Sequence, residues 1–213
     1  MTLSRRQTLA LLATLPIAGA AGLSVPALAK DGDLYPMLKL MAPAGIPDKI
    51  VLGPADAKVT VIEYASLTCP HCMRFNANTF PEVKSRYIDT GKIRYILRPY
   101  PRDNIDMLEW MLALTAQDSQ HVVDVMFTIQ DQLYATDKPG DLLKSTALQL
   151  GFTEETYQGV LTNQDMYNNL VKLRDQAGTE FGLEGTPTFY VNGKMLSGEL
   201  SIDDLAKEID PLL

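Results

Sequence analysis

Both cysteines of this 213-residue chain lie in one tetrapeptide, Cys69-Pro70-His71-Cys72. An apolar, β-branched stretch over residues 59–65 precedes the tetrapeptide, and a helical pattern follows it. The two thiols are therefore expected where a strand leads into a helix, which is the geometry that thiol–disulfide exchange needs. Since the sequence has no third cysteine, any disulfide within the chain joins Cys69 to Cys72 and is the reactive one.

The start of a helix favours the charged form of a cysteine placed there. Its first N–H groups lack partners within the helix, and they give this end a partial positive charge. Cys69 is expected at this start, with Cys72 one turn further in. His71 either adds a donor and, when protonated, a cation, or is a solvated histidine without a tuning role. A lowered pKa would make Cys69 the attacking sulfur and would make its disulfide a stronger oxidant.

The remaining pattern predicts an α/β chain with a helical interruption. The expected elements are a strand over 58–65, a helix over 70–90, a strand over 92–100, helices over 103–169, a helix over 167–181, a hairpin over 188–196 and a final helix after Ser201. Pro81 lies inside the first helix and should kink or divide it. Residues 31–50 are expected to form an irregular lead-in. This order indicates one domain that carries an inserted block of helices.

The first 29 residues have the three parts of a secretory signal peptide. The basic start is Ser4-Arg5-Arg6, an apolar run covers residues 9–28, and Ala27-Leu28-Ala29 is a small-x-small cleavage site. The paired arginines fit a twin-arginine signal and an ordinary export signal equally well. An uncleaved membrane anchor is the other alternative, although two prolines interrupt the run. We therefore expect export to an oxidising compartment.

Charge and ligand counts exclude several classes of function. The net charge is −7, and removal of residues 1–29 leaves 17 basic and 26 acidic residues, which argues against binding to nucleic acid. A closed zinc site needs four ligands. The only histidine besides His71 is His121, and there is no second cysteine pair. We therefore expect no metal and no cofactor.

Two separated segments resemble the DsbA-type thiol–disulfide oxidoreductases. Val61–Cys72 is similar to that family's active-site segment, and Gly185–Gly193 is similar to its cis-proline loop and following hairpin. The resemblance covers roughly residues 50–213. It implies an α/β, thioredoxin-like fold, in which a central mixed β-sheet is flanked by helices and carries an inserted all-helical subdomain. The expected organisation is a signal peptide over 1–29, a lead-in over 30–50 and one domain over 51–213, interrupted by the insertion at about 103–169.

The resemblance also implies roles for individual residues. Cys69 would be the nucleophile that forms the mixed disulfide, and Cys72 the more buried, resolving sulfur. Pro187, in cis, would lie against the dithiol, although base rates alone favour an ordinary trans proline there. Pro70, Thr186 and Pro187 would contact substrate, with Thr186 offering backbone groups to an extended chain.

Other positions have two interpretations. The resemblance places Glu63 beneath the dithiol, where it would assist proton transfer at the buried sulfur, but the residue could also face solvent. Arg94 and Arg98 share one face of the second strand and could pair with Glu63, although a solvated face is the expected interpretation. The apolar stretch 107–114 is either core or, where exposed, a substrate-binding patch.

The function implied is a periplasmic dithiol oxidase, exported by its signal peptide. Its partners would be reduced or misfolded secreted proteins and a membrane redox partner that reoxidises it. The first alternative is a disulfide isomerase or reductase on the same fold, for which residues 30–50 are a candidate dimer contact. The second is a module that binds Cu(I) through the two thiols. The oligomeric state does not follow from the sequence.

Overall fold

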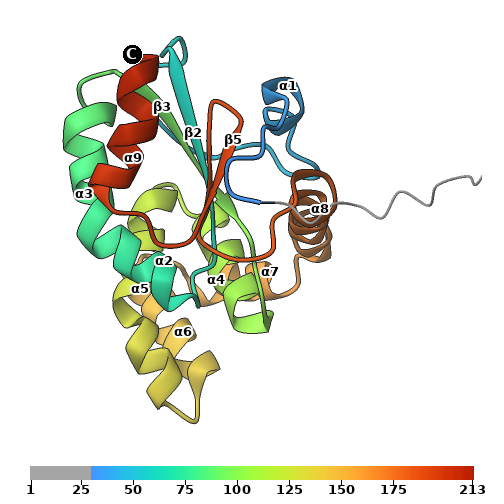
Figure 1. The fold of residues 1–213 in the computed structure, drawn as a ribbon. Coiled ribbons are helices and arrows are strands. Elements are labelled where there is room, and N and C mark those ends of the chain that lie inside the picture. Colours follow the sequence, from blue (N-terminus) through green and yellow to red (C-terminus); the bar gives the residue numbers. More distant parts are fainter. Residues whose placement is uncertain (1–29) are drawn as a thin grey trace, which may run out of the picture.

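The computed structural model describes residues 30–213, so the expected signal peptide lies outside the described residues. A five-stranded mixed sheet with the strand order β1-β3-β2-β4-β5 forms the centre (Figure 1). The strands are β1 (Ile50–Leu52), β2 (Val59–Ala65), β3 (Ile93–Pro99), β4 (Thr188–Val191) and β5 (Lys194–Ser197). β2 and β3 are parallel, and the other neighbouring pairs are antiparallel. The expected class, a mixed sheet flanked by helices, is confirmed.

Helices cover both faces of this sheet. They are α1 (Met37–Leu40), α2 (Pro70–Arg74), α3 (Phe80–Val83), α4 (Asn104–Thr115), α5 (Ser119–Ala135), α6 (Pro139–Gln149), α7 (Glu154–Leu161), α8 (Gln164–Phe181) and α9 (Ile202–Ile209). In Figure 1, α2, α3 and α9 lie on one side of the sheet, and α1 and α8 lie on the other. The helices α4 to α7 follow β3 without an intervening strand, in the segment where the sequence predicts a helical block.

β2 is buried on both of its faces because helices pack on each side. Its odd-numbered residues Val61 and Ala65 belong to the core beneath α2 and α3, while Ile62 and Tyr64 belong to the core beneath α1 and α8. A strand alternates its side chains between the two faces. Glu63 therefore points into the first core, on the side of the sheet that carries the active-site helix.

The helix predicted over 70–90 is a continuous helical run that contains two wider, π-helical segments. These are Phe75–Thr79 and Lys84–Ile88, on either side of α3. Pro81 lies in the first turn of α3, directly after the first π segment, so the run changes from π- to α-helical next to the proline but is not broken there. The run ends at Ile88, and Gly91 follows with a φ of +72°, a conformation that glycine adopts readily.

Two segments near the start of the described chain differ from the expectation. β1 was not predicted, because three residues are too few to show a strand pattern. The start of the lead-in is also more regular than expected. Its residues 32–35 run along β5, where the Gly32 N–H donates to Met195 O over 2.9 Å and the Tyr35 N–H donates to Gly193 O over 2.8 Å. The lead-in thus covers the open edge of β5.

The expectation of a solvated face at Arg98 is wrong. Arg98 is fully buried, and its guanidinium donates to both carboxylate oxygens of Asp48, over 2.6 and 2.8 Å, and to the Tyr64 hydroxyl over 2.9 Å. The register sets Arg98 opposite Tyr64 and Arg94 opposite Thr60, on the face away from Glu63. Among residues 30–213, neither arginine is hydrogen-bonded to Glu63.

Most of the apolar stretch 107–114 is core, and Leu108 packs against that core while partly buried. Met107, Trp110, Met111 and Leu112 are at most 4% exposed, so they form no surface patch for substrate.

Glu109 lies among them with no exposure, and both of its carboxylate oxygens lack a hydrogen-bond partner among the described residues. Burial raises the pKa of Glu109 well above its usual range, and the nearby carboxylates of α4 and its N-cap raise it further.

We expect the substitution Glu109→Gln to stabilise the protein at neutral and higher pH. The raised pKa means that the folded state binds more protons than the unfolded state, so stability falls as pH rises above the unfolded value of about 4.3. The glutamine of the variant does not ionise, so the variant does not lose this stability as the pH rises. Its melting temperature should therefore rise at pH 8, by about 2–4 °C per kcal/mol gained, and change little at pH 4. The exposed Glu180→Gln is the control. An equal gain for Glu109→Gln at both pH values would contradict the account.

Candidate active site

The dithiol lies where the sequence predicts it, at the junction of β2 and α2. Cys69 is the N-cap of α2, and Pro70 occupies the first helical position, where its missing N–H costs no hydrogen bond. Cys72 follows one turn further in. Both thiols are free in this structure, with Cys69 1% and Cys72 0% exposed. Pro70 and His71 are exposed beside them, so a partner can reach this end of the helix.

The surroundings of Cys69 stabilise its thiolate. The pKa of Cys69 is lowered to about 4, and the hydrogen bond from the Cys72 thiol contributes most to this lowering. Burial acts in the opposite direction. Hydrogen bonding from the Thr186 hydroxyl and from the backbone N–H groups of Cys72 and His71 lowers the pKa further. The Thr186 hydroxyl is buried without a hydrogen-bond partner among the described residues, so its hydrogen is available to this sulfur. The pKa of Cys69 is thus lowered, as expected from the sequence. The imidazole of His71 is absent from its causes.

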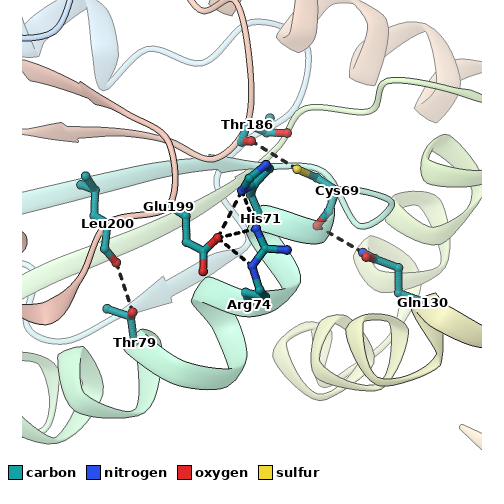
Figure 2. A network of polar contacts seen from close by, with 8 residues as sticks. All are labelled: Cys69, His71, Arg74, Thr79, Gln130, Thr186, Glu199 and Leu200. Carbon is teal, nitrogen blue, oxygen red and sulfur yellow. Dashed lines mark hydrogen bonds and ion pairs between the residues drawn. The ribbon is translucent and has the colours of Figure 1, made fainter.

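The loop before β4 lies directly against the dithiol. The peptide bond between Thr186 and Pro187 is cis, as the resemblance implied, and the Cys69 Sγ lies 3.2 Å from the Thr186 carbonyl oxygen (Figure 2). The Gly198 N–H donates to the Pro187 carbonyl over 2.8 Å and links this loop to the end of β5. A hollow extends from the loop, and residues 184–188 line it together with Met195 and Ser197. This hollow therefore includes Thr186, the residue that contacts Cys69.

Glu63 lies beneath the dithiol, so the alternative that it faces solvent is wrong. It is 4% exposed, and the hydroxyl of Tyr95 donates to its Oε2. Burial raises the pKa of Glu63 to about 7, while the bond from Tyr95 acts in the opposite direction and the charge of Cys69 raises the pKa further. Burial also raises the pKa of Cys72 well above its usual range, and the negative charges of Cys69 and Glu63 add to this effect. A carboxyl that titrates near neutrality can exchange protons with a thiol.

The imidazole of His71 belongs to a surface network of charged groups. Its Nδ1 lies 3.1 Å from Glu199 Oε2 and 2.7 Å from Arg74 Nη2, and Arg74 Nε donates to the same carboxylate oxygen over 2.9 Å (Figure 2). A nitrogen that donates to Glu199 carries a hydrogen, whereas one that accepts from Arg74 does not, so the two contacts are alternatives. The imidazole of His71 is therefore paired with charged neighbours on the surface rather than isolated in solvent.

Side chains of α5 hold the loop that leads into α2. Gln130 Nε2 donates to the Leu67 carbonyl over 2.6 Å and to the Cys69 carbonyl over 3.3 Å, and the Tyr134 hydroxyl donates to the Thr68 carbonyl. The two α5 residues are separated by one helical turn, so they lie on the same face of the helix. The inserted helices thus fix the backbone on which Cys69 stands.

Sequence reasoning missed Tyr95, Gln130, Tyr134 and Glu199. Tyr95 carried a usable signal, since strand alternation and the parallel register place it opposite Val61, on the face of Glu63. Glu199 follows β5 in a short connection without a pattern, and the α5 residues reach the loop only because the insertion packs on it.

Comparison with known proteins agrees with this geometry. A family model described as thioredoxin matches residues 46–211. The chain belongs to the thioredoxin family. It superimposes on the crystal structure of alpha-DsbA1 from Wolbachia pipientis with a TM-score of 0.74 and 28% sequence identity, over 82% of this chain and 94% of that one. The expected resemblance to DsbA-type proteins and the expected thioredoxin-like fold are therefore confirmed.

Curated relatives carry related names. A Rickettsia bellii protein, provisionally named as a protein-disulfide oxidoreductase, is 33% identical over 169 residues, which cover 76% of this chain and 63% of that protein. The disulfide bond formation protein D of Bacillus subtilis is 26% identical over 75% of each chain. This chain thus spans less than two thirds of the length of the Rickettsia relatives.

The composition of residues 30–213 bears on other classes of function. None of the helices in that range has the length and apolar character required to cross a bilayer. The same residues contain no group of three or more histidine, cysteine or acidic side chains arranged to hold a metal ion.

We expect the substitution Glu199→Gln to make the dithiol more oxidising. The carboxylate of Glu199 offsets the positive charge of Arg74 beside the start of α2, so its removal favours the Cys69 thiolate and the reduced protein. Because the pair is partly exposed, the equilibrium constant with glutathione should shift by about two- to fivefold toward the reduced protein.

Glu208→Gln is the matched control for this measurement. Glu208 is 26% exposed, against 29% for Glu199, and it pairs with Lys194 over 2.7 Å, so both substitutions remove one negative charge from an ion pair. An equal shift of the equilibrium constant in the two variants would show that net charge, rather than the network at His71, sets the effect.

Proposed function

We propose that this protein is a thiol–disulfide oxidoreductase that introduces disulfides into exported proteins. The observation that carries the proposal is the position of Cys69, a thiol with its pKa lowered to about 4, at the start of a helix and against a cis-proline loop. A low-pKa sulfur is a good leaving group and stabilises the reduced form of its dithiol.

The exchange takes two steps. A substrate thiolate attacks the Cys69 sulfur of the Cys69–Cys72 disulfide, so that a mixed disulfide forms and Cys72 leaves as a thiolate, which takes a proton from Glu63. A second substrate thiolate then attacks the substrate sulfur of the mixed disulfide. The substrate disulfide forms, and Cys69 leaves as its stable thiolate. Two electrons have passed from the substrate to the protein.

The direction of transfer follows from the thiolate. One pKa unit corresponds to about 1.4 kcal/mol, which is about 30 mV for a two-electron couple. A pKa lowered to about 4 therefore gives the dithiol a much higher potential than an ordinary cysteine would. Pro70, Thr186 and Pro187 would contact the substrate, with the Thr186 backbone pairing with an extended segment beside the mixed disulfide.

The proposal also covers the partners of the protein and the compartment in which it acts. Reduced or misfolded secreted proteins would be the substrates, and a membrane redox protein would reoxidise the dithiol. The signal-like residues 1–29 support export to the periplasm, with cleavage near Ala29. The isomerase or reductase and the Cu(I)-binding module are the alternatives that the experiments below distinguish.

The variant Cys72→Ser should accumulate mixed disulfides through Cys69. Without Cys72, Cys69 can exchange with a partner disulfide, but no neighbouring thiol can release the partner. Non-reducing gels of protein purified from the periplasm should show adducts that reductant removes. The matched variant Cys69→Ser should show few, because Cys72 is buried and its pKa is raised. Absence of adducts with Cys72→Ser, or equal yields from the two variants, would contradict the assigned roles.

Stoichiometric copper in the purified wild-type protein, without exchange activity, would favour the Cu(I) module.

The oxidised protein should be less stable than the reduced one. Reduction restores the Cys69 thiolate, and in the folded protein this thiolate accepts stabilising hydrogen bonds. The thiols of the unfolded chain accept none of these bonds. Reduction therefore stabilises the folded state relative to the unfolded state. Thermal melting at neutral pH, with and without dithiothreitol, checks this. A lower melting temperature after reduction, or a glutathione equilibrium as reducing as that of thioredoxin, would favour the reductase instead.

A further inference from the structure

Tyr95 is the side chain that holds the buried carboxyl group beneath the dithiol. Its hydroxyl donates to Glu63 Oε2, and both residues lie in the interior, with Tyr95 1% and Glu63 4% exposed. Water therefore has little access to the carboxylate. The state of that carboxylate depends on the groups that the protein places beside it.

Packing leaves the Tyr95 ring little freedom to turn away. Tyr95 stands on β3 opposite Val61 of β2, and its ring lies against Phe80 of α3, with the ring centroids 5.2 Å apart. Burial raises the pKa of Tyr95 well above its usual range, and the charge of Glu63 raises it further. The phenol thus keeps its proton at every pH at which the protein works, and it acts as a fixed donor.

We propose that Tyr95 is a positioning residue, which holds the Glu63 carboxylate for proton exchange with the Cys72 sulfur. This inference rests on the proposed function, because it assigns the proton of the exchange reaction. The step concerned is resolution. Cys72 gives its proton to Glu63, and its thiolate attacks Cys69 in the mixed disulfide. The Cys69–Cys72 bond then forms, and the partner leaves as a thiolate.

The physical reason lies in the opposing effects of burial and of the hydrogen bond. Burial favours the neutral carboxyl, which cannot accept a proton from Cys72, while the bond from Tyr95 favours the charged carboxylate, which can. The balance of the two effects leaves the pKa of Glu63 at about 7. Loss of the phenol hydroxyl would remove the stabilising donor and leave the burial in place.

The test is the rate of the Cys72-dependent step as a function of pH in the variant Tyr95→Phe. The reduced protein is mixed with glutathione disulfide, and the conversion of the Cys69–glutathione adduct to the intramolecular disulfide is followed. A hydrogen bond to a charged group is strong enough that the rate at pH 7 should fall about tenfold, with the profile displaced to higher pH.

Tyr190→Phe is the matched control. Tyr190 is also a fully buried tyrosine, and its hydroxyl donates to the Phe181 carbonyl over 2.7 Å, in the core on the other face of the sheet. This variant should leave the pH profile unchanged. In a Glu63→Gln background, Tyr95→Phe should produce no further change, because the group that it positions is gone.

Two outcomes separate the inference from the proposed function. A wild-type profile for Tyr95→Phe, together with a displaced profile for Glu63→Gln, would overturn the inference and leave the proposed function intact. Exchange that persists in Cys69→Ser would overturn the proposed function itself. Should Tyr95→Phe fail to fold, Glu63→Asp withdraws the carboxylate from the hydroxyl by one methylene group. The same displacement would then support the inference, and an unchanged profile would overturn it.

Discussion

The stabilised negative charge on Cys69 is the feature on which the rest of this structure depends. Its donors come from distant parts of the sequence: the backbone at the start of α2, the thiol one turn further along and the hydroxyl of Thr186. Each donor is ordinary by itself. Together they surround one sulfur that is almost fully buried, and they offset the cost of placing a charge there.

The fold can be understood as the support for this arrangement. β2 is the central strand, with one neighbour parallel and the other antiparallel, and it delivers the backbone to the start of α2. The hairpin of β4 and β5 brings the cis-proline loop to the same point. The inserted helices do more than enlarge the core, since Gln130 and Tyr134 bind the carbonyls of the loop at residues 67–69. A shift of α5 would therefore be transmitted to the backbone of Cys69.

The two sulfurs have opposite environments, which fits the separate roles proposed for them. Several donors lower the pKa of Cys69, whereas Cys72 faces the interior and two groups that carry negative charge. The first is suited to leave as an anion, and the second is suited to stay protonated until a base takes its proton. Glu63, buried next to the pair, has the pKa to serve as that base.

The sequence predicted those parts of the site that local patterns encode. Cys69 and Cys72 follow from their spacing at a strand-to-helix junction, whereas the cis form of Pro187 is implied only by the resemblance to DsbA-type proteins, since base rates alone favour trans. The parts that depend on packing between distant segments were missed or misjudged. Arg98 was expected in solvent because a charged residue in a strand usually is, yet Asp48 and the Tyr64 hydroxyl compensate for its burial. Glu199 carries no local signal at all.

The most direct test of this account is the acid titration of the Cys69 thiolate in the reduced wild-type protein, followed by its ultraviolet absorbance and by the pH dependence of alkylation. The account predicts that the sulfur is charged at neutral pH and that the signal is lost near pH 4. A transition near pH 8.5, the value for a free cysteine, would contradict it.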